Sequence, residues 1–259
     1  MLAPDVGGVA VPLVAIAGVL VVLYVVVTWN ARVAQDDAPV AAGAVDPIQL
    51  RRKAVHICIG MSFAIIGQYV LTAAEAVAAM TTSVAIFYAL HRWRRSDPKF
   101  NDTFNRLFAP VLRPRELHDL PSAFHMMVGV DLVLLLFPKP YAILATLLVT
   151  IGDPCASFFG VRLATPSSFR FANGKTLIGV TANATASFIV TATYLSVVVG
   201  DRDPVSVISQ GVVGGVSSAI AELCEVDGLD DNLAIPVVSA GALMTWRTVA
   251  PSGWVSVYR

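Results

Sequence analysis

The sequence predicts an all-α protein, a polytopic transmembrane helix bundle of about seven or eight helices. Hydrophobic residues make up 56% of the 259 residues, and the mean hydropathy is +0.71. Only 14% of the residues are charged, whereas soluble domains carry about a quarter. The apolar residues fall into runs close to the length of about 20 residues that a spanning helix requires. We therefore expect an integral membrane protein.

Eight apolar runs, bounded by their polar interruptions, are the expected helices. They cover residues 11–29, 54–71, 72–90, 122–137, 141–159, 177–199, 205–223 and 233–249. The run at 122–137 is shorter than a full span, which predicts a tilted or partly sunken helix. The first run has an acidic flank and no small-residue cleavage site, so we interpret it as a retained helix. We expect residues 1–50 to form this N-terminal helix and a polar linker, and residues 51–259 to form one membrane-embedded domain.

Positive charge is unequally divided between the two sides of the predicted bundle. If the eight helices alternate in direction, the loops at 30–53, 91–121, 160–176 and 224–232 share one face. These loops hold every one of the 18 Lys and Arg residues except Lys139, Arg202, Arg247 and Arg259. The positive-inside rule makes this face cytoplasmic. The formal net charge of zero excludes a globally basic nucleic-acid binder, and we expect no nucleic-acid partner.

A basic segment opens the second expected helix on the cytoplasmic face. Arg52 and Lys53 precede His56 by four and three residues, so on a helix all three share one side. That side can present two cations and an imidazole to one anion. The structural alternative is a topogenic cluster that extends to the lipid headgroups, with a hydrogen-bonded histidine in the core.

Asp153 lies near the end of the fifth run, between a glycine and Pro154. A carboxylate at the centre of a membrane helix costs about 2.5–3.5 kcal/mol and less near the interface, so it requires a cation or a strong donor. We interpret Asp153 as a metal ligand or a base. The alternatives are a partner for Arg162 or an N-terminal cap for a short helix after Pro154.

Small residues recur around Asp153 at every fourth position. Gly152, Ala156 and Gly160 would let another backbone approach closely, and alone this spacing indicates helix packing.

The segment Gly174-Lys175-Thr176 invites comparison with a P-loop, but the match fails. The pattern requires glycine five residues before Gly174, where Phe169 stands, and no strand precedes it. A flexible loop that leads into a helix N-terminus still offers free N–H groups and a favourable dipole to an anion beside a lysine. We therefore expect phosphate binding here without a Walker fold.

Acidic residues gather around the last cytoplasmic turn. A solvated loop explains Glu225 and Asp227, but it explains Glu222 poorly because Glu222 ends an apolar run. Carboxylates near phosphate are what Mg²⁺ or Ca²⁺ requires, so Glu222 and Asp231 are candidate metal ligands. Asp131 lies within the apolar run at 122–137. For this residue, a functional role and a structural ion pair are equal alternatives.

Taken together, these motifs resemble those of the CTP-dependent lipid-alcohol kinases, the group that contains dolichol kinase, phytol kinase and the fungal diacylglycerol kinase. That family's nucleotide signature runs Asp-x-x-Ala-x-x-x-Gly and then, after a loop, Lys-Thr/Ser-x-x-Gly-x-x-Ala. The matching residues are Asp153, Ala156 and Gly160, then Lys175, Thr176, Gly179 and Ala182. The family's Arg-Lys motif and carboxy-terminal motif are matched by Arg52, Lys53 and His56, and by Glu222, Asp231, Asn232, Leu233 and Pro236. The similarity covers residues 51–240 in the same order.

Some positions depart from the family pattern. Gly174 replaces one lysine of the usual pair, and Ile178 stands where dolichol kinases often carry an acid. The segment from Ala156 to Gly160 is most similar to the diacylglycerol kinase branch.

The resemblance implies a kinase domain over residues 51–259 that transfers the γ-phosphate of CTP to a membrane lipid alcohol. Diacylglycerol is the expected acceptor, giving phosphatidate, with phytol and polyprenols such as dolichol as alternatives. Arg52, Lys53 and Lys175 would neutralise the triphosphate, and Asp153 would take the hydroxyl proton. Asp153, Glu222 and Asp231 would hold Mg²⁺ or Ca²⁺. The remaining residues implied in nucleotide binding are Gly152, Ala156, Gly160, Gly174, Thr176, Gly179, His56 and Asn232.

Two further hypotheses belong to other classes. A CTP-using cytidylyltransferase would also need cation and triphosphate sites. A small transporter would use an intramembrane charge pair around Asp131, although transporters usually place their sites near the midplane and the charge here lies on one rim.

The expected location is a multi-pass membrane protein with its site on the cytoplasmic face, in the endoplasmic reticulum if the chain is eukaryotic. A plastid or plasma membrane is the alternative. The sequence does not decide between CTP and ATP as the phosphate donor. It also leaves open whether the protein forms a homo-oligomer.

Overall fold

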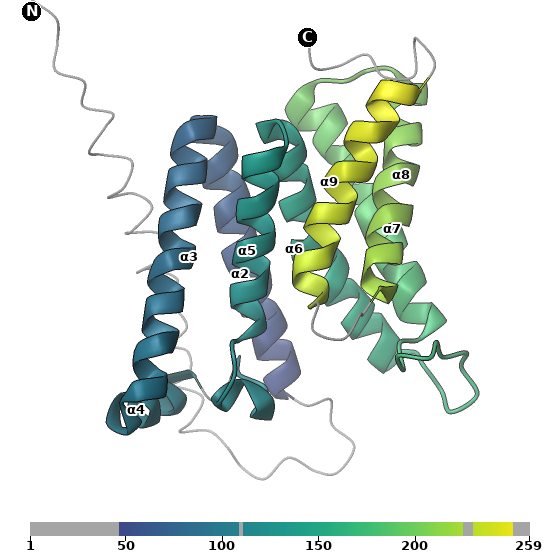
Figure 1. Cartoon of the computed structure of the whole chain (residues 1–259). Helices are drawn as coiled ribbons and strands as arrows, with labels where there is room; N and C mark the ends of the chain where they lie inside the picture. Colours follow the sequence, from purple (N-terminus) through teal and green to yellow (C-terminus); the bar gives the residue numbers. More distant parts are fainter. Residues whose placement is uncertain (1–46, 109–110, 225–229, 251–259) are drawn as a thin grey trace, which may run out of the picture. The chain divides into compact units, whose positions relative to one another are not determined.

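The computed structural model describes residues 47–108, 111–224 and 230–250, and within them the fold is entirely helical (Figure 1). The only β-type pairing among these residues is an isolated bridge between Arg170 and Thr176. The α-helices are α2 (Pro47–Tyr69), α3 (Ala73–Ser96), α4 (Pro98–Phe108), α5 (Ser122–Leu136), α6 (Lys139–Arg162), α7 (Leu177–Thr193), α8 (Pro204–Leu223) and α9 (Asp231–Val249). The 3₁₀ turn η2 (Pro114–Leu117) precedes α5, and the π-helical turn η3 (Tyr194–Val199) continues α7. The predicted all-α class is confirmed.

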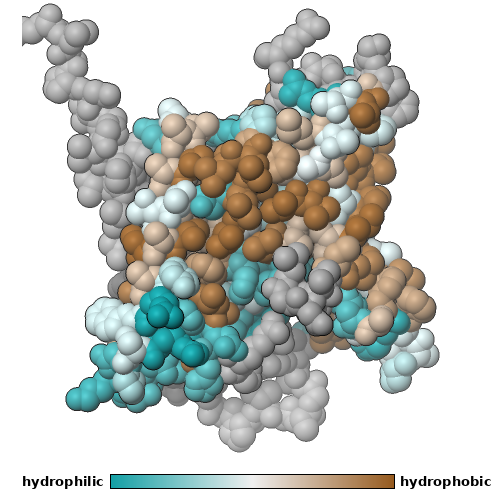
Figure 2. Space-filling view, viewed as in Figure 1, coloured by the Kyte–Doolittle hydropathy of each residue, from teal (hydrophilic) through white to brown (hydrophobic). Residues whose placement is uncertain are grey.

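Four of the described helical segments are both long and apolar enough to cross a membrane. They are α3, α6, α7 with η3, and α8, and α5 is a shorter apolar helix. Figure 2 shows hydrophobic side chains along the length of the helices and hydrophilic ones gathered around α4. The protein is therefore an integral membrane protein. The predicted helix at 11–29 lies outside the described residues.

Two local predictions were wrong. Residues 91–121 were expected to form a loop, but α3 continues to Ser96 and α4 follows it. Helix α4 has a polar composition, and its phenylalanines recur at every fourth position, so that Phe100 stacks on Trp93 with ring centroids 4.1 Å apart. The cap proposed for Asp153 is also wrong, because α6 runs through Pro154 without a break.

The chain divides into two compact units, Met1–Phe124 and His125–Arg259. We describe each by itself. The predicted boundary at residue 50 stays a prediction, because residues 1–46 are outside the described part.

In the second unit, α6 is the central helix. Two-thirds of its apolar stretch (67%) is buried, against 28% for α7 with η3 and 50% for α8. It packs against α7 and α9, and α8 closes the group by packing against both of them (Figure 1). Tyr141, Leu144 and Leu148 of α6 are almost fully buried in this core. This packing places the C-terminal halves of α6 and α8 next to the N-terminal ends of α7 and α9.

Helices α6 and α7 approach closely because small residues face one another. A Cβ built on Gly160 would lie 3.3 Å from the Cα of Gly179. A Cβ on Gly179 would lie only 2.8 Å from the backbone oxygen of Ala156. Since real Cβ atoms do not approach backbone atoms so closely, glycine is required at this crossing.

A cluster of buried polar side chains joins α7 to α8 one turn deeper. The Oδ1 atom of Asn183 accepts hydrogen bonds from the hydroxyls of Ser218 (2.7 Å) and Ser187 (3.2 Å). All three residues have no exposed surface. Gly152 of α6 lies against the same cluster, because a Cβ there would be 2.8 Å from Oγ of Ser187. Interhelical hydrogen bonds of this kind help to hold membrane helices together.

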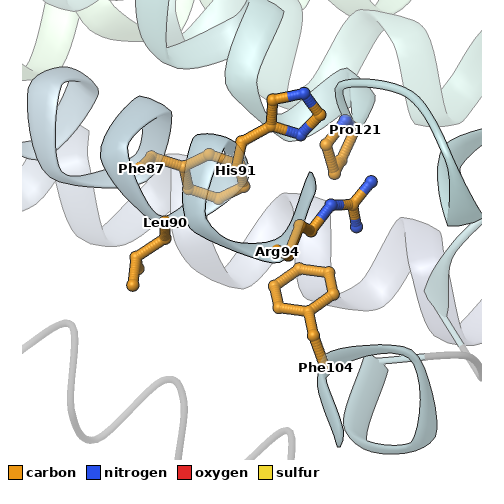
Figure 3. Close-up of a pocket in the computed structure, with 6 residues that line it drawn as sticks. All are labelled: Phe87, Leu90, His91, Arg94, Phe104 and Pro121. Atoms are coloured by element: carbon orange, nitrogen blue, oxygen red, sulfur yellow. The ribbon is translucent and has the colours of Figure 1, made fainter. Parts of the chain in front are cut away.

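In the first unit, buried Arg94 fixes the segment that leads into α5. Its Nη2 donates to the carbonyl oxygens of Glu116 and Asp119, and its guanidinium lies 4.7 Å from the centre of the Phe104 ring. The side chain is 2% exposed. Figure 3 shows Arg94 and His91 beside a small cavity that Phe87, Leu90, Phe104 and Pro121 complete. The arginine thus joins α3, α4 and the segment around η2.

Glu116 is the second organising residue of this segment. Its carboxylate accepts from the backbone N–H of Arg113 (2.8 Å), the backbone N–H of Ser122 (3.0 Å) and the Ser122 hydroxyl (2.7 Å). Burial alone would raise the pKa of Glu116, but these donors together with Arg52 lower it below its usual value. The Glu116 carboxylate is therefore charged, and in this form it holds the start of α5 in place.

Replacing Gly179 by alanine should destabilise the second unit. The added methyl group would meet the Ala156 backbone, and relief of such overpacking costs about 1–3 kcal/mol. Thermal unfolding in detergent measures this loss. Gly241→Ala is the matched control, because its nearest neighbour would be 3.9 Å away at Phe137, and its unfolding midpoint should stay unchanged. Equal midpoints for the two variants would contradict the close approach of α6 and α7.

Glu116 should make the stability of the first unit depend on acid pH. Because its folded pKa lies below the unfolded value, its stabilisation is present above the unfolded pKa and is lost as the pH falls below about 4. Glu116→Gln should remove this part of the pH dependence and cost about 1–3 kcal/mol at neutral pH through lost hydrogen bonds. Unfolding midpoints measured across the acid range test this. Asp119→Asn, at an exposed position, is the control.

Candidate functional site

Lys175 is held at the start of α7 by a small hairpin formed by residues 169–177. The N–H of Phe171 donates to the Lys175 carbonyl (2.8 Å), and the N–H of Leu177 donates to the Phe169 carbonyl (3.1 Å). Gly174 makes the turn in the left-handed region, with φ of +81°. The hairpin explains how a lysine is presented at a helix N-terminus without the strand of a P-loop.

Asn173 ties this hairpin to the end of α8. Its Oδ1 accepts from the Lys175 N–H (3.1 Å), and its Nδ2 donates to the Leu223 carbonyl (3.1 Å). Thr176 then caps α7, since its hydroxyl accepts from the N–H of Gly179 (3.1 Å) and the residue is buried. Lys175 therefore has little freedom to change its position.

Three carboxylates from three helices meet around the Lys175 ammonium. Nζ lies 3.1 Å from Oε1 of Glu222 on α8 and 3.0 Å from Oδ2 of Asp231 on α9, and it also donates to the Glu222 carbonyl. Asp153 of α6 completes the group. One carboxylate oxygen from each of Asp153, Glu222 and Asp231 lies within 4.8 Å of the others. The structure thus brings together the four charged residues that the sequence predicted for this unit.

The cluster sets three carboxyl groups against the single ammonium of Lys175, and burial together with Asp153 raises the pKa of Asp231. Asp153 and Glu222 are each 5% exposed, so water does not screen them well. Burial lowers the pKa of Lys175, but Asp231 and Glu222 raise it by more, and the ammonium stays charged. Oε2 of Glu222 is buried and has no hydrogen-bond partner in the described part of the chain. A donor set of three carboxyl groups and no nitrogen or sulfur suits Mg²⁺ or Ca²⁺.

Asn232 orients Asp231. Its Nδ2 donates to Oδ1 of Asp231 (3.1 Å) and to Oδ1 of Asp230 (2.7 Å). Asp230 is also the N-cap of α9, accepting from the Asn232 N–H. The amide therefore leaves Oδ2 of Asp231 facing Lys175. A direct contact between Asn232 and nucleotide stays a prediction.

The small residues of the nucleotide signature have a visible packing role. Gly152, Ala156, Gly160 and Gly179 lie where α6 and α7 cross, and Thr176 lies against Gly160. Gly174 instead lies at the open turn of the hairpin, with nothing within 4 Å of its Cβ position. Their part in nucleotide binding stays a prediction.

Arg52, Lys53 and His56 belong to α2 in the first unit and are partly buried. The predicted spacing on one continuous helix is confirmed. Nη2 of Arg52 donates to the Ser122 hydroxyl (2.9 Å) and lies 3.9 Å from Glu116. These contacts give Arg52 a structural role within its own unit, and its role toward phosphate stays a prediction.

Two contributors to the site were not predicted from the sequence. Asn173 accepts a hydrogen bond from the N–H of Lys175, two residues later in the chain. This is the spacing of an Asx turn, so the sequence alone could have indicated it. Asp230 directly precedes a predicted helical run, and Asp in that position is a common N-cap. The tether from Asn173 to Leu223 spans 50 residues and had no signal in the sequence.

Comparisons with known proteins agree with the motif pattern. The chain is 29% identical over 204 residues to the CTP-dependent diacylglycerol kinase 1 of Schizosaccharomyces pombe, which covers 74% of this chain and 90% of the relative. It is 26% identical over 163 residues to an uncharacterised protein of Rickettsia prowazekii, covering 60% of this chain and 74% of that protein. No protein-family profile and no solved structure matches the sequence.

The aligned portion of the yeast enzyme is nearly its whole length, so the similarity is not confined to one motif. Together with the helical membrane fold, this similarity supports an enzyme of the CTP-dependent lipid kinase type.

Proposed function

We propose that the protein transfers the γ-phosphate of CTP to the hydroxyl of diacylglycerol and so forms phosphatidate. The observation that carries this proposal is the cluster of Asp153, Glu222 and Asp231 around Lys175. A lysine fixed at a helix N-terminus can bind phosphate, and the carboxylates can bind the cation that accompanies a nucleoside triphosphate.

Asp153, Glu222 and Asp231 would hold Mg²⁺ or Ca²⁺. Such an ion supplies neutralisation of the charge that develops on the phosphate oxygens during transfer. The convergence of three carboxyl groups and the unpartnered Oε2 of Glu222 support this assignment.

In the proposed transfer, the lipid hydroxyl oxygen forms a bond to the γ-phosphorus while the bond from that phosphorus to the β–γ bridging oxygen breaks. CDP leaves, and the hydroxyl proton passes to the carboxylate of Asp153. Lys175 neutralises charge on the transferring phosphoryl group, so most of the catalytic effect is positioning and charge stabilisation. Arg52, Lys53 and His56 are proposed to contact the triphosphate on the strength of their sequence motif.

The identity of donor and acceptor rests on the yeast relative, whose name gives both CTP and diacylglycerol. Phytol and polyprenols are the competing acceptors. The segment Ala156-Ser157-x-x-Gly160 supports diacylglycerol, because it is most similar to that branch of the family.

The site is proposed to face the cytoplasm. The excess of Lys and Arg in the loops on the Lys175 side supports this orientation through the positive-inside rule. In a eukaryotic cell the endoplasmic reticulum is the proposed membrane.

Lys175→Met should lower kcat for phosphate transfer by about 10²–10³-fold, as expected when one preorganised donor to a developing charge is removed. The assay is transfer of label from γ-labelled CTP to diacylglycerol, phytol and a polyprenol in separate reactions. Lys139→Met, at the other end of α6, should retain activity. Wild-type turnover by Lys175→Met would remove the lysine from the reaction, and pyrophosphate release by the wild type would indicate nucleotidyl transfer instead.

The three carboxylates should bind a divalent ion without nucleotide. Removal of metal with a chelator should abolish transfer, and Mg²⁺ or Ca²⁺ should restore it. Binding of Mn²⁺, followed by electron paramagnetic resonance, should weaken by more than about tenfold in Asp153→Asn and Glu222→Gln. Asp203→Asn, at the N-cap of α8 at its other end, should bind Mn²⁺ as the wild type does. Unchanged Mn²⁺ affinity in both site variants would contradict the metal assignment.

A further inference from the structure

Large apolar side chains are exposed around the hairpin that carries Lys175. Phe169 is 62% exposed and Leu163 is 58% exposed, although both belong to the connection between α6 and α7 rather than to a spanning helix. The last turns of α6 and the first residue of α7 extend this surface. We call it the apolar rim, and its residues are Phe158, Phe159, Val161, Leu163, Phe169 and Leu177.

The apolar rim is fixed relative to the catalytic lysine. The hydrogen bond from Leu177 to Phe169 places these two residues side by side at the base of the hairpin. Phe169 also packs edge to face against Phe171, whose N–H binds the Lys175 carbonyl. Asn173 fastens the same hairpin to the end of α8. Any surface that covers the rim is therefore held at a set position beside Lys175.

The chain segment that carries the apolar rim has charged side chains of one sign, and its Lys175 is paired with Glu222 and Asp231. No Asp or Glu occurs between residues 154 and 200, and the charged side chains near the rim are Arg162, Arg170 and Lys175. The Arg162 guanidinium lies 5.7 Å from the centre of the Phe158 ring. Aromatic and aliphatic side chains combined with cations are typical of the boundary between headgroups and acyl chains of a membrane that contains anionic lipid.

We propose that the apolar rim is an interfacial lipid-binding surface that lies in the headgroup boundary and presents the acceptor to Lys175 from the bilayer. Phe169, Leu163 and Val161 enter the outer acyl region, while Arg162 and Arg170 bind lipid phosphate groups. The assignment of the acceptor rests on the proposed function. The lipid-binding role rests only on the exposure of the apolar side chains and on the charge of the segment that carries them. The lipid-binding role and the identity of the acceptor can therefore be tested separately.

The first experiment compares acceptors in Phe169→Ser. In vesicles of phosphatidylcholine with phosphatidylserine, its apparent KM for long-chain diacylglycerol, given as a mole fraction of the bilayer, should rise by roughly tenfold. Its KM for a short-chain diacylglycerol dissolved below its aggregation concentration should rise much less. Val197→Ser is the matched control, because Val197 is 75% exposed in η3 at the other end of the same helical segment. An equal KM rise for both acceptors, or no rise for either, would overturn the proposal.

The second experiment needs no catalysis. A fluorophore is attached at Phe169→Cys in a protein whose Cys58, Cys155 and Cys224 are replaced by alanine, and the protein is reconstituted with brominated phosphatidylcholine. Strong quenching at position 169, with weaker quenching at Ser167→Cys, supports the proposal. An unquenched label would overturn it and would indicate a protein partner on this surface. If the label is quenched but the protein phosphorylates no acceptor, the proposed function is rejected and the lipid-binding surface is still supported.

Discussion

The contact of one ammonium group with two carboxylates, beside a third, organises the second unit of this enzyme. Lys175 joins the start of α7 to the end of α8 and the start of α9, and Asp153 of α6 lies in the same group. Without the lysine, buried carboxylates from three helices would repel one another in a medium that screens them poorly. The hairpin, its Asn173 tether and the Thr176 cap all serve to keep the ammonium in this position.

The packing of the helices below the charged group explains why it can be maintained. Gly160 and Gly179 bring α6 against α7, and the buried amide of Asn183 binds serines of α7 and α8 while Gly152 leaves space for it. The chain therefore places small residues and interhelical hydrogen bonds within about two turns of its acids. In a bilayer, where apolar side chains gain little by leaving lipid for protein, such close contacts are the main source of helix association.

The sequence was sufficient for the helical class and for the grouping of Asp153, Lys175, Glu222 and Asp231. Long apolar runs mark the helices, and alternation of direction puts these four residues at one rim. Hydropathy could not detect α4, because its apolar face is carried by a few phenylalanines in a polar segment. The sequence also could not distinguish a glycine that binds nucleotide from a glycine that packs against a neighbouring helix. Gly152 and Gly160 belong to a nucleotide signature by sequence, whereas their visible contacts are with the neighbouring helix, and only coordinates show which backbone lies opposite.

Gly174 illustrates how backbone conformation limits the electrostatics of the hairpin. The motif that the sequence resembles has a second lysine at this position. Here the residue has φ of +81°, and nothing lies within 4 Å of its Cβ position, so a side chain would have room but an unfavourable backbone conformation. Left-handed geometry costs an ordinary residue roughly 1–2 kcal/mol. The left-handed turn therefore disfavours a second lysine at position 174, and the other cation of this hairpin is Arg170, whose Nη1 donates to the Gly174 carbonyl (3.2 Å).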